Sequence, residues 1–346
     1  MTQVKRVLVI DDSAYVRKVV TQILSRSPFL EVVGTARDGK DALEKVEQLN
    51  PDVVTCDLIM PEMDGVEFVR EQMKRRHLPV IIMSIASETA EMALTALEVG
   101  AIDFVQKPTA LATDKILEIS EELISKVKAA ASIPISRLPL IETTKPAKLS
   151  ITKPPKNAVN MVVLGISTGG PQALRYLIPQ LPANFSAPLA IVMHMPVGYT
   201  EMYAKKLNEL SSLKFREANE GDVFEPGLAL LAPAGRHLTF RRKENGAAVA
   251  HLDARPFETL HRPSVDVLFQ SAAETFGPRV LGVIMTGMGT DGKEGASWIK
   301  ARGGLIYTES EETCIVYGMP RTIEEAGLSD RSVPLHAMAQ AIWEVV

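Results

Sequence analysis

Short apolar runs alternate with amphipathic stretches along most of this 346-residue chain. Near the N-terminus, the apolar runs at residues 6–10 and 52–56 enclose stretches at 16–24 and 43–49 in which apolar residues recur at helical spacing. This alternation is typical of βαβ units, in which helices connect neighbouring parallel strands. The chain is also longer than a single hydrophobic core normally supports. The sequence therefore predicts two α/β domains.

A proline-rich stretch divides the chain. Five prolines fall among Ser, Thr and Lys residues between about residues 131 and 156. Such a segment cannot propagate a helix or fill a sheet, so it favours a semi-extended tether over an irregular loop packed on one domain. We predict a first domain at residues 1–129, a linker at 130–157 and a second domain at 158–346.

Composition narrows the class of protein. A net charge of -4 and a pI near 6.0 argue against a protein that binds the phosphate backbone of nucleic acid. No apolar run approaches the roughly 18 to 20 residues that a membrane helix needs, and the N-terminus lacks the apolar segment of a signal peptide. The only cysteines, Cys56 and Cys314, are expected to be buried thiols. We expect a cytoplasmic protein that does not insert into a membrane.

Polar residues follow the predicted strands of the first domain. The residues that directly follow its apolar runs are Asp11, Asp12, Asp57, Ser84 and Lys107. Because parallel strands end at one edge of a sheet, we expect these side chains to lie close together. One aspartate at a strand end is commonly a turn or cap residue, but carboxylates packed together repel one another unless a cation lies between them. All-oxygen ligands suit Mg²⁺, so the set favours a magnesium site.

The same residues carry a resemblance to a known family. They occur with three further motifs: Met60-Pro61, Asp64-Gly65 and Lys107-Pro108. Together they closely resemble the receiver domain of response regulators in two-component signalling. The resemblance implies a flavodoxin-like fold with a parallel five-stranded sheet. It also implies that Asp57 is the phosphoacceptor, whose carboxylate forms an aspartyl phosphate.

The resemblance also implies roles for the neighbours of Asp57. The implied Mg²⁺ ligands are Asp11 (through a water molecule), Asp12, Asp57 and the backbone carbonyl of Ile59. Ser84 would hydrogen-bond one phosphoryl oxygen, and the Lys107 ammonium group would meet another. Phe104 stands where receiver domains carry their switching aromatic residue, although it lacks the hydroxyl group of the tyrosine often found there.

A second α/β pattern follows the linker. Its predicted strands are 162–165, 188–193, 228–232 and 280–285, and its clearest helices are 265–276 and 335–346. The runs at 237–240 and 247–252 predict a β-hairpin across Glu244-Asn245-Gly246. We therefore expect an α/β domain whose sheet is mostly parallel and is made mixed by this hairpin.

Ser167 lies in a Gly-rich turn between a predicted strand and a predicted helix, in the sequence Gly165-Ile166-Ser167-Thr168-Gly169. Such a turn can bind an anion through free backbone N–H groups, but the spacing fits neither G-x-G-x-x-G nor the P-loop. Ser and Gly are also ordinary turn residues. The third interpretation is a serine nucleophile, which requires a base and a group that orients the base.

The remaining sequence offers both partners. His194 directly follows an apolar run, and Asp291 lies in a second Gly-rich turn that follows another. Ser, His and Asp from three strand ends would supply the nucleophile, general base and orienting carboxylate of acyl transfer. The order Ser, acid, His of α/β-hydrolases would require His336 instead. Because His336 begins a predicted helix rather than following a strand, the set Ser167, His194 and Asp291 is favoured.

Six motifs of the second half form a recognisable set: Ser167-Thr168-Gly169-Gly170, His194-Met195-Pro196, Ala232-Pro233 with His237, Arg262-Pro263-Ser264-Val265-Asp266, Thr286-Gly287-Met288-Gly289 with Asp291-Gly292, and Tyr317-Gly318-Met319-Pro320. They resemble the catalytic domain of the CheB family, the chemotaxis protein-glutamate methylesterases. The resemblance implies that Ser167, His194 and Asp291 catalyse ester hydrolysis. It further implies that the backbone N–H of Met288 and the nearby Thr168 support the oxyanion.

The resemblance also implies the biological setting. The substrates would be methylated glutamates on the cytoplasmic domains of methyl-accepting chemoreceptors, and glutamine side chains would be deamidated more slowly. A chemotaxis histidine kinase would phosphorylate the receiver and so activate the esterase. The esterase chemistry would need no cofactor. The alternative is a response regulator whose second domain is a non-catalytic, receptor-binding adaptor.

One position departs from the family pattern. Glu309-Ser310 stands where relatives usually carry Gln-Asp, a few residues before the Tyr-Gly-Met-Pro segment. We expect this departure to affect the rim of the substrate site and not the three catalytic side chains.

Overall fold

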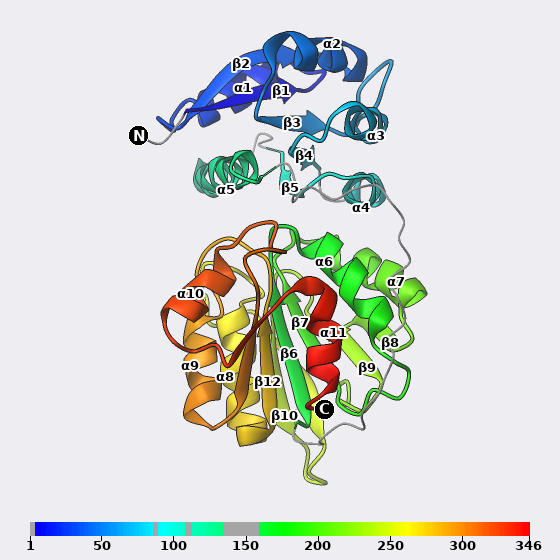
Figure 1. Ribbon diagram of the computed structural model, residues 1–346, viewed down its shortest axis with the longest axis vertical. Helices are drawn as coiled ribbons and strands as arrows, with labels where there is room; N and C mark the ends of the chain where they lie inside the picture. The colour runs from blue at the N-terminus through cyan, green and yellow to red at the C-terminus, as the bar shows by residue number, and fades with distance from the viewer. Residues whose placement is uncertain (1–3, 86–88, 108–112, 135–158) are drawn as a thin grey trace. The chain divides into compact units, whose positions relative to one another are not determined.

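The computed structural model describes residues 4–85, 89–107, 113–134 and 159–346. The chain folds as two units, Met1–Thr143 and Thr144–Val346, each with its own sheet and helices (Figure 1). Most of the predicted linker, residues 130–157, lies outside the described residues. Helix α5 (Thr113–Ala131) continues past the limit that we predicted for the first domain at residue 129.

The first unit has one five-stranded sheet, in the order β2-β1-β3-β4-β5, in which all neighbouring strands are parallel. Its strands are β1 (Lys5–Ile10), β2 (Leu30–Ala36), β3 (Val53–Asp57), β4 (Val80–Ser84) and β5 (Asp103–Gln106). Its other helices are α1 (Ala14–Leu24), α2 (Gly39–Leu49), α3 (Gly65–Arg75) and α4 (Ala90–Glu98). Helices α1 and α5 cover one face, and α2, α3 and α4 the other (Figure 1). The predicted flavodoxin-like architecture is confirmed.

The cap residue Asp64 and the glycine Gly65 determine how the chain passes from β3 into α3. Asp64 Oδ1 accepts the backbone N–H of Glu67 at 2.8 Å and so satisfies one of the free donors at the helix N-terminus. Gly65 begins the helix because a Cβ there would lie 2.2 Å from the backbone oxygen of Asp57. This close approach packs the start of α3 against the end of β3, next to Asp57.

The second unit is built on a seven-stranded sheet in the order β14-β13-β12-β6-β7-β9-β8. Its strands are β6 (Met161–Ile166), β7 (Leu189–Met193), β8 (Lys214–Glu217), β9 (Leu228–Leu231), β12 (Val280–Ile284), β13 (Leu305–Glu309) and β14 (Arg331–Val333). Its helices are α6 (Gly170–Leu177), α7 (Thr200–Leu210), α8 (Val265–Phe276), α9 (Lys293–Ala301), α10 (Met319–Glu325) and α11 (Leu335–Trp343). Helices α6, α7 and α11 cover one face, and α8, α9 and α10 the other (Figure 1).

The predicted β-hairpin is present, but it does not belong to the large sheet. Strands β10 (His237–Arg242) and β11 (Ala248–Asp253) form a separate antiparallel two-stranded sheet, and every neighbouring pair in the seven-stranded sheet is parallel. The hairpin packs instead on α8, where the Phe240 N–H donates to Ser271 Oγ at 2.9 Å. The expectation of a mixed sheet was therefore wrong, because helix α8 offers the apolar face that the hairpin needs.

Both cysteines lie in the interior of the protein. Cys56 and Cys314 are both buried free thiols. Among the described residues, no helix combines the length and the apolar character that crossing a bilayer would require.

Candidate functional site

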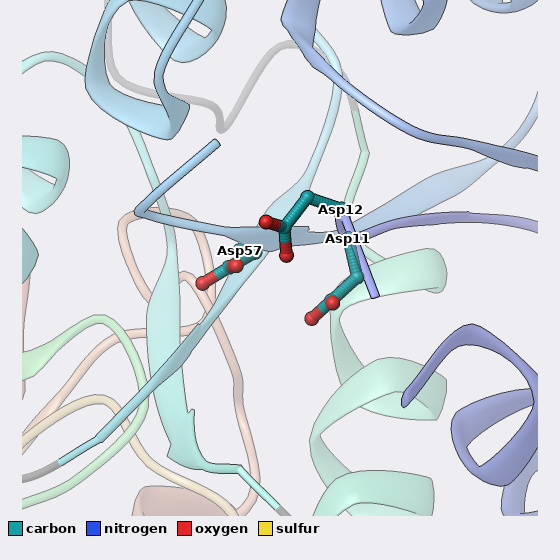
Figure 2. Close-up of side chains that lie close together, drawn as sticks. All are labelled: Asp11, Asp12 and Asp57. Atoms are coloured by element: carbon teal, nitrogen blue, oxygen red, sulfur yellow. The ribbon is translucent and has the colours of Figure 1, made fainter. Parts of the chain in front are cut away.

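Three aspartates lie side by side where β1 and β3 end (Figure 2). Asp11 and Asp12 follow β1, Asp57 is the last residue of β3, and the two strands are paired neighbours. One carboxylate oxygen from each aspartate lies within 4.8 Å of the others. Asp11 and Asp57 are buried, whereas Asp12 is exposed. The structure thus brings the three predicted carboxylates together.

Lys107, which follows β5, reaches into this cluster. Its Nζ lies 2.7 Å from Asp57 Oδ2 and 3.0 Å from Asp11 Oδ2. Burial raises the pKa of the Asp57 carboxyl group, although the nearby Lys107 opposes this effect. Burial would lower the pKa of Lys107, but the two carboxylates outweigh it and the pKa is raised. The ammonium group therefore stays charged within the cluster.

The donor set of the cluster suits Mg²⁺. The backbone N–H of Ile59 donates to Asp57 Oδ1 at 3.4 Å, so the Ile59 peptide lies beside the predicted phosphoacceptor. Carboxylate and carbonyl oxygens are the ligands that this hard cation prefers. Three carboxylates face one ammonium group, so an excess of negative charge remains for a divalent ion to balance. The residues present therefore fit the implied metal.

Ser84 and Phe104 lie on β4 and β5, the next two strands of the sheet. Ser84 ends β4, the neighbour of β3, and its Oγ contacts the hydroxyl oxygen of Thr89. Phe104 lies in β5 with its ring buried. Lys126 Nζ donates to the Phe104 carbonyl oxygen at 2.9 Å and lies 5.9 Å from the ring centroid. Thr89 and Lys126 were not singled out from the sequence, because neither follows a predicted strand.

In the second unit, Ser167, His194 and Asp291 come from three adjacent strands. Ser167 follows β6 and His194 follows β7, and the last residues of these strands are paired. The His194 N–H donates to the Ile166 carbonyl oxygen at 3.3 Å, which fixes the two strand ends together. Asp291 lies in the turn after β12, the other neighbour of β6. The structure brings all three side chains to one edge of the sheet.

His194 contacts Asp291 directly, with 2.8 Å between Nε2 and Oδ2. Because a carboxylate only accepts, we assign the hydrogen to Nε2 and leave Nδ1 as the basic nitrogen. Nδ1 is buried and has no hydrogen-bond partner among the described residues. Ser167 Oγ and His194 form no hydrogen bond in the described structure. Hydrogen bonds between a nucleophile and its base are often long in the free enzyme and tighten when substrate binds.

Asp291 is held by the start of α8. Its Oδ1 accepts the Ser264 hydroxyl at 2.8 Å and the Asp266 N–H at 3.0 Å, and its Oδ2 accepts the Val265 N–H at 2.8 Å. Burial alone would raise the pKa of Asp291. The contact with His194 and the N–H donors outweigh burial and hold the pKa below its usual range. The carboxylate is therefore ionised and fixed in orientation.

Asp266 supports the same turn from the other side. Its Oδ1 accepts the N–H of Gly292 at 2.9 Å and that of Gly295 at 2.7 Å. Burial and the neighbouring charge of Asp291 raise the pKa of Asp266. Asp266 and Asp291 therefore tie the start of α8 to the turn after β12.

The turn after β12 packs directly on Ser167. The Ser167 N–H donates to the Thr286 carbonyl oxygen at 3.0 Å. A Cβ on Gly287 would lie 2.8 Å from the Cβ of Ser167 and 2.5 Å from Met319 Sδ, so only glycine fits there without movement. Ser167 and the turn after β12 therefore fix each other's position.

Two predicted oxyanion residues flank Ser167. The Thr168 Oγ1 is buried without a hydrogen-bond partner in the described part of the chain. The Met288 N–H, in the turn after β12, donates to no acceptor among the described residues, whereas the adjacent Gly287 N–H donates to the Val316 carbonyl oxygen at 3.0 Å. A free backbone donor beside the nucleophile is what an oxyanion site needs.

Two residues near the histidine were missed by the sequence analysis as site residues. His261 stacks on His194, with ring centroids 3.9 Å apart and an angle of 23° between the planes. Ser264 donates to Asp291, as described above. Ser264 belongs to a motif quoted for the family, which was a usable signal, whereas His261 lies in an irregular loop where periodicity says nothing.

Glu309 does not lie on a substrate rim, which corrects our expectation. Its side chain is fully buried, and its Oε2 accepts the Thr286 N–H at 2.9 Å. The neighbouring Ser310 is not exposed either, and its Oγ has no hydrogen-bond partner among the described residues. The expectation was wrong because Glu309 is the last residue of β13 and its side chain turns inward beneath the turn after β12.

Comparisons with known proteins agree for both units. The family described as CheB methylesterase matches residues 162–342, and the family described as response regulator receiver domain matches residues 7–119. The structure is similar to the crystal structure of the Thermotoga maritima CheB methylesterase catalytic domain, with a TM-score of 0.53 and 39% identity, over 54% of this chain and 99% of that one.

Full-length relatives cover both units. A Myxococcus xanthus protein named protein-glutamate methylesterase/protein-glutamine glutaminase 5 is 48% identical, over 96% of this chain and 95% of its own length. A Pyrococcus abyssi protein named protein-glutamate methylesterase/protein-glutamine glutaminase is 41% identical, over 99% of this chain and 93% of its own. The chain belongs to the CheB methylesterase family, in the form that also carries a response regulator receiver domain.

Proposed function

We propose that this chain hydrolyses glutamate methyl esters on chemoreceptors, that it deamidates glutamines there more slowly, and that phosphorylation of Asp57 activates it. The names of its relatives include both activities, methylesterase and glutaminase, which supports this proposal. The observation that carries the proposal is the His194–Asp291 contact of 2.8 Å at the sheet edge that also bears Ser167. A domain that acted only as a receptor-binding adaptor would not need this arrangement.

Hydrolysis proceeds in two steps. Ser167 Oγ attacks the ester carbonyl carbon while His194 Nδ1 takes the hydroxyl proton, and Asp291 stabilises the imidazolium ion that forms. The bond to the methoxy oxygen then breaks, the proton passes from His194 to that oxygen, and methanol leaves an acyl-serine. Water attacks the acyl carbon and gives a proton to His194. The glutamate carboxyl group departs and Ser167 regains its proton.

The oxyanion is stabilised by groups already in place. The free N–H of Met288 is the principal donor, and the unpartnered Thr168 hydroxyl lies nearby. Loss of one such donor typically adds about 2.7 to 4 kcal/mol to the barrier. Nucleophile, base and oxyanion donors all come from the chain, so the proposed ester hydrolysis requires no cofactor.

The receiver supplies the control. Asp57 accepts the phosphoryl group from a chemotaxis histidine kinase, and Ser84 and Lys107 hold its oxygens. The proposed Mg²⁺ ligands are Asp11 through a water molecule, Asp12, Asp57 and the Ile59 carbonyl. When bound, Mg²⁺ balances negative charge between the carboxylates and the phosphoryl oxygens. Phe104 is the proposed switching residue that reports phosphorylation to the rest of the receiver.

We place the receiver at residues 1–129, the linker at 130–157 and the esterase at 158–346. The two family matches, at 7–119 and 162–342, fall inside these limits. Because the proposed substrate glutamates and the kinase lie in the cytoplasm, we propose that the chain works there.

The proposal is tested on a purified receptor fragment that carries methylated glutamates and glutamines. Mass spectrometry follows conversion of both side chains to glutamate by wild type, by Ser167→Ala and in buffer alone. We expect wild type to convert the esters faster than the amides, and Ser167→Ala to match the buffer. Conversion by Ser167→Ala at the wild-type rate would contradict the serine mechanism.

A further inference from the structure

Glu309 is a buried acid that the mechanism above does not use. Its side chain has no solvent exposure. Its Oε2 accepts the Thr286 N–H at 2.9 Å, and its Oε1 lies 3.0 Å from Thr313 Oγ1. Both partners are neutral, and no cation pairs with Glu309 in the described part of the chain. A buried carboxylate without a cation is costly, so these surroundings favour the neutral acid.

Thr286, the residue that Glu309 anchors, connects three parts of the esterase site. Its carbonyl oxygen accepts the Ser167 N–H at 3.0 Å. Its hydroxyl donates to the Thr168 carbonyl oxygen at 2.9 Å and accepts the Val316 N–H at 3.0 Å. The next residues in the chain are Gly287 and then Met288, whose backbone N–H is the free oxyanion donor. A shift of Thr286 would therefore move the nucleophile and the oxyanion donor together.

We propose that Glu309 is a positioning residue of the esterase, which acts as a neutral carboxyl group to hold Thr286 and, through it, the Ser167 turn and the Met288 N–H. The inference rests on the proposed function. Glu309 touches no substrate atom and acts only through Thr286. Its ionisation would place a negative charge directly behind the turn that must stabilise an oxyanion, and would therefore slow the chemical step.

The hydrogen bonds can accommodate the neutral form. When Oε1 carries the hydrogen, it donates to Thr313 Oγ1, and the Thr313 hydroxyl has the Ser310 carbonyl oxygen at 3.5 Å as its own acceptor. The Thr286 N–H keeps Oε2 as its acceptor. Burial raises the pKa of Glu309 to about 7, against the Thr286, Thr313 and Cys314 donors. The change of charge therefore falls in the pH range where the enzyme would work.

Other titratable groups lie on the segments next to Glu309, and none of them forms an ion pair with its side chain among the described residues. They include Glu311, Glu312, Cys314 and Tyr317 in the loop after β13, Arg331 on β14, His336 on α11, and Arg321, Glu324 and Glu325 on α10, which packs on β13. Arg331 pairs with Glu344 at 3.0 Å, and the Tyr317 hydroxyl donates to Glu324 at 2.7 Å. Cys314 Sγ lies 3.6 Å from the Glu309 carbonyl oxygen. Among the described residues, Glu309 thus has hydrogen-bond donors but no ion-pair partner.

The test compares full-length wild type, Glu309→Gln and the exposed control Glu312→Gln in methanol release from methylated receptor membranes, from about pH 6 to pH 9. A glutamine amide reproduces the neutral form, because it can accept the Thr286 N–H and donate to Thr313 Oγ1. Above about pH 7 we expect kcat of wild type and of Glu312→Gln to fall by about tenfold with KM little changed. Glu309→Gln should hold its kcat.

Thermal unfolding gives a second readout that does not depend on activity. The ordinary pKa of the carboxyl group is 4.5, and the folded value is about 7. Between these pH values the unfolded chain releases the proton and the folded chain keeps it, so the stability of wild type falls as pH rises. Because Glu309→Gln lacks this titration, Tm of wild type minus Tm of the variant should decrease across that interval.

Each readout can overturn the inference. Identical pH profiles for wild type and Glu309→Gln, or a constant difference in Tm, would each contradict the role of Glu309 while leaving the serine mechanism intact. Ser167→Ala is included in the same assay. Release of methanol by Ser167→Ala at the wild-type rate would instead overturn the proposed function and, with it, this inference.

Discussion

At the scale of single residues, the side chain held most firmly at the esterase site is Asp291. Four donors meet its two oxygens: His194 Nε2, the Ser264 hydroxyl and the N–H groups of Val265 and Asp266. An ionised carboxylate so fixed can keep the hydrogen of His194 on Nε2 and leave Nδ1 basic. In this account, Asp291 selects the tautomer of His194 that can accept a proton from Ser167.

Asp291→Asn should therefore remove most of the esterase activity without changing the fold. The Asn amide would donate a hydrogen to His194 Nε2 or leave Nε2 without a partner. The imidazole would then lose the tautomer with the hydrogen on Nε2, which the reaction needs. We expect kcat to fall by about 10³- to 10⁴-fold, as tautomer loss does in other serine triads. Methanol release and circular dichroism measure the two effects, with Glu312→Gln as the control. An active Asp291→Asn would show that another group orients His194.

At the scale of elements, the turn after β12 and the turn after β6 form one packed unit. Gly287 permits this, because a Cβ there would lie 2.8 Å from the Ser167 Cβ. The hydrogen bond from the Ser167 N–H to the Thr286 carbonyl oxygen joins the same two turns. The geometry of the nucleophile is therefore a property of two neighbouring strand ends rather than of the Ser167 turn alone.

Gly287→Ala should separate the two turns. The added methyl group overlaps Ser167 and Met319, and relief of the overlap moves the Met288 N–H with it. We expect the free energy of unfolding to fall by about 1 to 3 kcal/mol. We also expect kcat to fall by more than the loss of folded protein accounts for. Thr290→Ala, an exposed change in the same turn, is the matched control. Denaturant unfolding and methanol release check the prediction, and unaltered kcat in Gly287→Ala would contradict it.

The sequence predicted the elements that periodicity marks and missed those that depend on three-dimensional packing. The buried strands β1, β3, β6 and β7 stood out as apolar runs, and the polar residues that follow them located both sites. The edge strands β8 and β14 are partly exposed and carry no such run. The position of the hairpin on α8 and the inward turn of Glu309 depend on which surfaces meet, and a sequence pattern does not record that.

At the scale of the whole molecule, the proposed phosphorylation site and the proposed esterase site lie in separate folded units. Control of one by the other requires little free energy. A tenfold activation corresponds to about 1.4 kcal/mol of coupling, and a hundredfold activation to about 2.7 kcal/mol. In the proposed function the receiver is therefore a modest switch, and the esterase keeps a basal rate without it.

Removal of divalent cations should distinguish the two sites. In the proposed function, the carboxylate cluster of Asp11, Asp12 and Asp57 holds the Mg²⁺ that phosphorylation requires, whereas ester hydrolysis needs no metal. We expect a chelator to abolish the stimulation by a small phosphodonor and to leave the unstimulated rate of methanol release unchanged. Added Mg²⁺ should restore the stimulation. Loss of the unstimulated rate in the chelator would mean that the esterase itself uses a metal.

The most direct test of the central claim is methanol release from methylated chemoreceptor membranes by wild type, Ser167→Ala and Asp57→Asn, each with and without a phosphodonor and Mg²⁺. The account predicts release by wild type that rises with the phosphodonor, release by Asp57→Asn that does not respond to it, and no release by Ser167→Ala. Equal release by wild type and Ser167→Ala would contradict the account, and a full response in Asp57→Asn would contradict its switch.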